Sequence, residues 1–93
     1  EEMIAYQSSS LKENFLAKRF AAKEAFSKAL GTGLRGSVNL QAISITHNNM
    51  GKPSFEFNKQ VQNILSNRNI IYQHLSISDE KNIAVAFVVL DKL

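Results

Sequence analysis

Apolar and polar residues follow two different periods along this chain, and the change of period predicts where helix gives way to strand. From about Ser10 to Leu30 strong helix formers prevail, without glycine or proline, and Ser10 with Glu13 has the spacing of a capping box. Gly31 follows the last periodic residue, where a left-handed residue often ends a helix. We therefore predict one long helix that ends at Leu30.

The stretch after this helix has the two-residue period of strands. Apolar residues alternate with polar ones over 38–45, but the phase slips midway, which predicts one strand with a bulge. A turn is expected at 48–51, where asparagine and glycine gather. Phe55 and Phe57 then continue the alternation, which predicts a second strand.

The remaining segments complete an α+β fold. Residues 59–67 place apolar side chains on one face of a short helix, and 72–78 alternate as a strand. Residues 79–82 are expected to turn the chain into 83–90, an apolar run that predicts a central strand covered on both faces. Residues 1–6 are predicted to be helical. The simplest assembly is an antiparallel sheet packed against the one long helix.

Composition narrows the class of protein. The 93 residues fit one domain, 1–93, and a domain this small often gains stability by oligomerising. The absence of cysteine excludes disulfides and thiolate metal sites and favours a reducing compartment. The longest apolar run is too short to span a bilayer. The formal net charge of +3 suits nucleotides or acidic proteins and does not demand nucleic acid.

Glu24 and Lys28 are neighbours on the long helix, four residues apart, beside Ala17 and Ala21. Two interpretations remain open for this pair. The first is a solvent-exposed ion pair, which contributes only about 0.3–0.5 kcal/mol. The second is a carboxylate that binds metal or accepts a proton, next to a cation for phosphate, with the alanines allowing close approach. The spacing alone does not separate them.

Two further features also allow two interpretations. The Gly31–Gly33 segment follows a helix carboxyl terminus, whereas phosphate prefers an amino terminus, so a plain turn is the simpler interpretation. His74 either lies on the open face of a strand or lines a pocket with Ser76 and Ser78. His47 is predicted to be solvated. The phenylalanines are predicted to be core residues.

Four segments in order resemble holo-acyl-carrier-protein synthases, of the 4′-phosphopantetheinyl transferase superfamily. The most specific is Phe15-Leu-Ala-Lys-Arg-Phe-Ala-Ala-Lys-Glu-Ala25, followed by Lys28-Ala-Leu-Gly-Thr-Gly33. Gly51-Lys-Pro53 and His74-Leu-Ser-Ile-Ser78 come next, before a closing apolar strand. The similarity extends over about residues 1–90.

The resemblance implies an Mg²⁺-dependent enzyme of fatty acid biosynthesis. It would transfer 4′-phosphopantetheine from coenzyme A to a serine of apo-acyl carrier protein, in the cytoplasm, as a homotrimer with sites between subunits. Neither nucleic acid nor a membrane is expected as a partner. Glu24 and Lys28 would be catalytic, with Glu24 also binding the metal. The resemblance assigns to the coenzyme A cleft Arg19, Lys23, Lys28, Gly31, Thr32, Gly33, Lys52, Pro53, His74 and Ser76.

The chain also departs from the family pattern. The family has an amino-terminal strand with a second metal-binding aspartate, then a basic helix that docks the carrier, and we expect both to be missing here. This predicts that the chain by itself is catalytically impaired. Asp79 stands where many members have histidine. The alternatives are a non-catalytic module that grips an acidic protein or nucleic acid through Arg19 and Lys23, or a family member that has lost the transfer activity.

Overall fold

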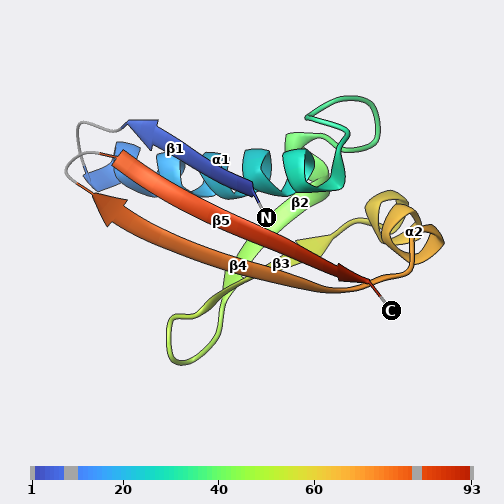
Figure 1. Ribbon diagram of the computed structural model, residues 1–93. Helices are drawn as coiled ribbons and strands as arrows, with labels where there is room; N and C mark the ends of the chain where they lie inside the picture. The colour runs from blue at the N-terminus through green and yellow to red at the C-terminus, as the bar shows by residue number, and fades with distance from the viewer. Residues whose placement is uncertain (1, 8–10, 81–82, 93) are drawn as a thin grey trace.

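The computed structural model describes residues 2–7, 11–80 and 83–92, without the side chains of 11–13 and 80. A long helix packs on one face of a three-stranded antiparallel sheet, and a two-stranded hairpin crosses beside them (Figure 1). The α+β prediction is confirmed. The elements in chain order are β1 (Glu2–Gln7), α1 (Leu11–Leu30), η1 (Leu40–Ala42), β2 (Ile43–His47), β3 (Pro53–Phe57), α2 (Lys59–Asn67), β4 (Ile70–Glu80) and β5 (Ile83–Lys92).

Helix α1 ends where the sequence predicts. Gly31 has φ +90°, and its N–H donates to the carbonyl of Lys28 at 3.0 Å. The N–H groups of Thr32 and Gly33 both donate to the carbonyl of Ser27, each at 3.1 Å. This is the Schellman arrangement, in which a left-handed residue lets the chain fold back and satisfy the last carbonyls. The predicted capping residue Ser10 lies outside the described residues.

We expect Gly31→Ala to lower the free energy of unfolding by roughly 1–2 kcal/mol, because a Cβ at this positive φ meets the following carbonyl. No neighbouring atom lies within 4 Å of a Cβ built there, so backbone conformation is the source of the cost. Urea denaturation measures the loss. Gly31→Asn, which tolerates the left-handed region, should lose less. Equal losses in both variants would contradict this explanation.

The prediction of helix for residues 1–6 is wrong. Residues Glu2–Gln7 form strand β1, which pairs antiparallel with β5 in the register Met3↔Phe87. Six residues are too few to form a stable helix alone, whereas β5 offers hydrogen-bonding partners for the whole segment. Ile4 then packs against the core. Strand β4 also runs further than predicted, through Asp79 and Glu80, and residues 81–82 lie outside the described part of the chain.

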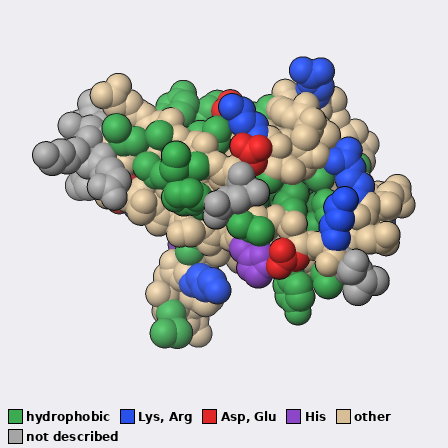
Figure 2. Space-filling view, viewed as in Figure 1, with side chains coloured by type: hydrophobic (Ala, Val, Ile, Leu, Met, Phe, Trp, Pro, Cys, Tyr) green, Lys and Arg blue, Asp and Glu red, His purple; other side chains and the backbone are tan. Residues whose placement is uncertain are grey.

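Strand β5 is central, as predicted, but it is not covered on both faces. Ala84, Ala86 and Val88 are fully buried, while Phe87 is 38% exposed and its partner Met3 is 57% exposed. The cause is that α1 covers only one face of the sheet (Figure 1). The other face is the open face, and Figure 2 shows hydrophobic side chains gathered on it over β1 and β5.

Alanines on α1 fill the contact with the sheet. Ala17 and Ala21 are buried, and so they do not form the open floor beside Glu24 that the sequence suggested. Small side chains on both α1 and β5 let the helix lie close to the sheet. Further along α1, Phe26 is fully buried with its ring centroid 4.6 Å from that of Phe57 and 5.2 Å from that of Phe55. This aromatic group joins α1 to the hairpin.

The hairpin segment differs from the prediction at its start. The expected bulge is a turn of 3-10 helix, η1, because the Asn39 side chain accepts a hydrogen bond from the Ala42 N–H at 3.0 Å. In the hairpin segment the strands are β2 and β3, which pair in the register Ile45↔Phe55. The predicted helix at 59–67 is confirmed as α2, whose first turn is capped by the side chain of Asn58.

Candidate functional site

Helix α1 separates the predicted site residues onto two flanks. Glu24 lies one turn after Phe20, whose ring centroid is 4.7 Å from that of Tyr6 on β1, so Glu24 faces the β1 side. Lys23 lies on the other flank, where its Nζ donates to the carbonyl of Leu40 in η1 at 2.9 Å. Arg19, one turn before Lys23, is on this second flank.

Glu24 and Lys28 do not form an ion pair. Among the residues that the structure describes, the salt bridges are Lys18–Asp79 and His74–Asp91. The Glu24 side chain is half-buried and that of Lys28 is exposed. The first interpretation of this pair is therefore wrong, and a carboxylate and an ammonium stand one turn apart, each open to a ligand.

The metal chemistry open to Glu24 is limited. In the described part of the chain no three His, Cys, Asp or Glu side chains come together as a metal site. Mg²⁺ commonly takes only one or two protein carboxylates and completes its shell with water and substrate phosphates. The Glu24 carboxylate, which forms no salt bridge with any described residue, fits that mode of binding.

Arg19 and Pro53 meet at a cavity of about 210 Å³ between α1, the hairpin and β4. The Arg19 Cζ lies 4.7 Å from the centroid of the Phe15 ring, and its Nε is buried without a partner among the described residues. We call this the cationic cavity, lined by Phe15, Lys18, Arg19, Ile45, His47, Gly51, Pro53 and Ile77. Cations above an apolar floor suit a ligand that joins an anionic group to an apolar one.

Three residues of the cationic cavity were missed in the sequence. Phe15 was predicted to be core but is 51% exposed, because it lies with Arg19 on the flank of α1 that faces the cavity. His47 was predicted to be merely solvated. Lys18 received no role, although its place beside Arg19 and one turn after Asn14 could have indicated a shared polar edge of the helix.

The Lys23 side chain is partly buried and is held against η1. Desolvation by burial and the nearby Arg19 cation both lower the pKa of the Lys23 ammonium. Its hydrogen bond to the Leu40 carbonyl compensates for part of this burial. Lys23 therefore links η1 to α1.

The glycine loop and the hairpin turn are ordered by their own hydrogen bonds. The N–H groups of Gly31, Thr32 and Gly33 donate to helix carbonyls, which leaves none of the three directed at a phosphate. In the hairpin, the Asn48 Oδ1 accepts hydrogen bonds from the N–H groups of Met50 and Lys52, each at 2.9 Å. Lys52 is thereby held, exposed, on a projecting turn (Figure 1).

His74 and Ser76 lie on the open face of the sheet, because the alternating Leu75 points inward and is buried. The His74 Nε2 is 2.8 Å from Asp91 Oδ2 on β5, and the Tyr72 ring centroid is 6.0 Å from that of His74. Within a single chain, His74 therefore lies on the open face of a strand, which is the first of its two interpretations. Within one chain α1 is on the other face, so these residues do not join Glu24 and Lys28.

Asp79 connects the end of β4 to α1. Its Oδ2 is 2.9 Å from the Nζ of Lys18, one turn after Asn14 on α1. The hydrogen bond from Lys18, with smaller help from Asn14 and the Lys18 charge, holds the pKa of the Asp79 carboxyl below its usual 3.8. Asp79 is thus ionised at neutral pH.

The lowered pKa of Asp79 predicts a pH-dependent stability. Because the carboxyl is the stronger acid in the folded chain, its stabilising effect is full above pH 3.8 and is lost as the pH falls through the folded-state pKa. We expect the wild-type chain to exceed Asp79→Asn in urea midpoint at about pH 7, with the gap closing as the pH falls below 3.8. A gap that stays constant over this range would contradict the assignment.

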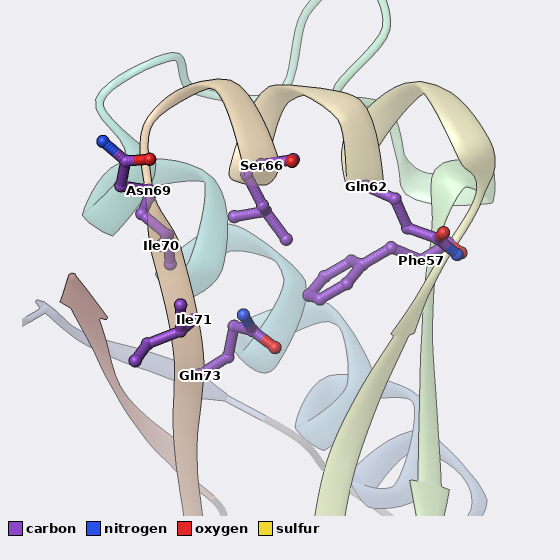
Figure 3. A pocket seen from close by; sticks show the side chains of 8 residues that line it. Phe57, Gln62, Ser66, Asn69, Ile70, Ile71 and Gln73 are labelled. Carbon is purple, nitrogen blue, oxygen red and sulfur yellow. The ribbon is translucent and has the colours of Figure 1, made fainter. Parts of the chain in front are cut away.

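A second cavity, of about 380 Å³, lies between β3, α2 and the start of β4. Phe57 points from β3 toward Gln73 of β4, and Gln62 reaches down from α2 (Figure 3). The Gln62 Nε2 donates to the Phe57 carbonyl at 2.7 Å. The lining carries no charged side chain and none of the predicted site residues.

Comparison with known proteins identifies the family. The model described as the 4′-phosphopantetheinyl transferase superfamily matches residues 1–88. The chain belongs to this superfamily. The holo-[acyl-carrier-protein] synthase of Nitrosospira multiformis is 51% identical over 92 residues, which cover 99% of this chain and 74% of that protein. The resemblance found in the α1 motif is therefore confirmed.

Solved structures of superfamily members share the fold. The holo-[acyl-carrier-protein] synthase of Neisseria meningitidis is 46% identical with a TM-score of 0.84, covering 90% of this chain and 67% of that one. The Bacillus anthracis synthase, solved in complex with CoA (3′,5′-ADP), is 40% identical with a TM-score of 0.74, over 92% of this chain and 66% of that one.

No helix in the described residues is long and apolar enough to cross a membrane.

Proposed function

We propose that this chain transfers 4′-phosphopantetheine from coenzyme A to a serine of apo-acyl carrier protein, releasing 3′,5′-ADP, with Glu24 and Lys28 as the catalytic pair. The observation that supports this most directly is that the two charged groups, one turn apart in a superfamily member, do not neutralise each other. The transfer serves fatty acid biosynthesis in the family, and we extend this role, with a cytoplasmic location, to the present protein.

The reaction requires charge neutralisation at the pyrophosphate. The serine oxygen attacks the β-phosphorus, the bond to the bridging oxygen breaks, and 3′,5′-ADP leaves with the electron pair. Lys28 is the cation assigned to the phosphate oxygens of the leaving group, and Glu24 is assigned to accept the serine proton. Mg²⁺, held by Glu24, would neutralise negative charge on the non-bridging oxygens.

The cationic cavity supports binding of the nucleotide end of coenzyme A. That end joins a flat apolar ring to phosphates, which matches an apolar floor beneath Lys18 and Arg19. Pro53 contributes to the floor, and Lys52 precedes it on the exposed turn. We propose that Lys23 and the Gly31–Gly33 loop position the residues of this cleft and do not themselves contact coenzyme A.

A homotrimer would combine the two halves of the site. Glu24 lies on the β1 side of α1 and His74 on the open face of the sheet, so one chain does not bring them together. Association through the open face would bury Met3 and Phe87 and could bring one subunit's His74 and Ser76 beside a neighbour's α1. The net charge of +3 suits an acidic carrier protein as the partner.

Mass spectrometry of the carrier tests the function. The purified natural protein that contains residues 1–93 is incubated with apo-carrier, coenzyme A and Mg²⁺, and the carrier should gain the mass of one phosphopantetheine, whereas residues 1–93 alone should transfer more slowly. A chelator should abolish the gain, and excess Mg²⁺ should restore it. Transfer that resists the chelator would contradict the metal assignment. A folded protein that never modifies any acyl carrier protein would overturn the function.

A further inference from the structure

Asp79 introduces a negative charge at the edge of the cationic cavity. Lys18 lines the cavity, and its Nζ is at the same time 2.9 Å from the Asp79 carboxylate. Arg19, the other strong cation in the lining, makes no salt bridge among the described residues and keeps its Nε without a partner. Within the described part of the chain, Arg19 therefore has no salt-bridge partner, whereas Lys18 is paired with the Asp79 carboxylate.

The position of this carboxylate is fixed and not incidental. Lys18 holds it from α1, and its backbone is held in the sheet, where Asp79 of β4 pairs with Ala84 of β5. Both side chains of the Lys18–Asp79 pair remain partly exposed, at 37% and 46%. An anion entering the cavity would compete with Asp79 for the Lys18 ammonium and would also feel direct repulsion from the carboxylate.

We propose that Asp79 is a specificity-determining residue that weakens the binding of phosphate-bearing nucleotides in the cationic cavity by neutralising Lys18. This proposal rests on the proposed function only in taking the nucleotide end of coenzyme A as the natural ligand. The proposal leads to an unusual expectation, since deleting a polar contact at a binding site normally reduces the affinity for the ligand. Here deletion of the carboxylate should increase it.

The test is a double-mutant cycle on ligand binding, read by calorimetry with 3′,5′-ADP and without Mg²⁺ or carrier. Asp79→Asn should tighten 3′,5′-ADP binding roughly three- to tenfold at low salt. Lys18→Met should change the affinity less than about twofold in the wild-type background, but should remove the gain in the Asp79→Asn background. The gain should shrink as salt is added.

Two controls isolate the electrostatic effect. Glu56→Gln removes one negative charge from an exposed position on β3 and should leave 3′,5′-ADP affinity unchanged. Uncharged adenosine should bind the wild type and Asp79→Asn equally, because it carries no phosphate to repel. A tightening that also appears with Glu56→Gln would mean a general effect of net charge and would overturn the proposal.

The outcomes separate this inference from the proposed function. If Asp79→Asn weakens or does not change 3′,5′-ADP binding, or if neither the wild type nor Asp79→Asn binds it, the inference is wrong, whether or not the protein transfers phosphopantetheine. If the Asp79-dependent tightening is found but no carrier is ever modified, the inference stands and the proposed function fails.

Discussion

Glu24→Gln is expected to lower the rate of phosphopantetheine transfer by roughly a hundredfold or more. Glutamine keeps the shape of the side chain but removes the negative charge that would hold Mg²⁺ and accept the serine proton. Because Glu24 makes no ion pair among the described residues, the fold should not depend on its charge. The rate is measured from the mass of the carrier over time, at saturating coenzyme A.

The matched control is again Glu56→Gln, which should transfer at the wild-type rate. Thermal denaturation should show the same midpoint for Glu24→Gln as for the wild type. If Glu24→Gln retains most of its activity at low Mg²⁺, Glu24 is neither the metal ligand nor the proton acceptor. An accompanying large loss of stability would instead mean that the residue acts through the fold.

Phe26→Ala is expected to have the largest effect on stability, a loss of about 3–5 kcal/mol. The side chain is fully buried and lies between α1 and the hairpin, against Phe55 and Phe57. Truncation removes its buried apolar area and leaves a cavity that the stiff sheet cannot close. The free energy of unfolding of a typical domain is only about 5–15 kcal/mol, so urea denaturation should show a markedly lower midpoint.

Met50→Ala is the comparison variant, since it also removes a large apolar side chain but one that is 93% exposed on the hairpin turn. This variant should change the free energy of unfolding by no more than about 0.5 kcal/mol. Phe26→Leu, which keeps most of the apolar volume, should fall between the two. If Phe26→Ala and Met50→Ala lose similar stability, the aromatic group is not the centre of the core.

Local sequence signals predicted the elements that depend on local interactions. Gly31 ends α1 because only a residue that tolerates positive φ can close the helix there, and that requirement is visible in the sequence. Helix α2 shows its cap and its apolar face within 58–67. The failures are β1 and η1. Strand β1 exists because β5 pairs with it. The start of η1 depends instead on a local hydrogen bond that the Asn39 Oδ1 accepts from the Ala42 N–H.

The site shows the same division. The residue types were found through the family resemblance, which the comparisons confirm, and the roles of Glu24 and Lys28 remain proposals. The sequence did not show that α1 separates Glu24 from Arg19, nor that Phe15 and Lys18 line the cavity with Arg19. Those facts depend on which side of the helix meets the sheet and which meets the hairpin.

By itself, then, the sequence determined the α+β class, the span of α1 and the family. Each of these follows from periods, caps and motifs that act over a few neighbouring residues. The tertiary structure alone decided that β5 is covered on one face, that His74 lies away from Glu24, and that Asp79 reaches Lys18. The reason is physical: these contacts join residues far apart in the chain, and packing, not local preference, selects them.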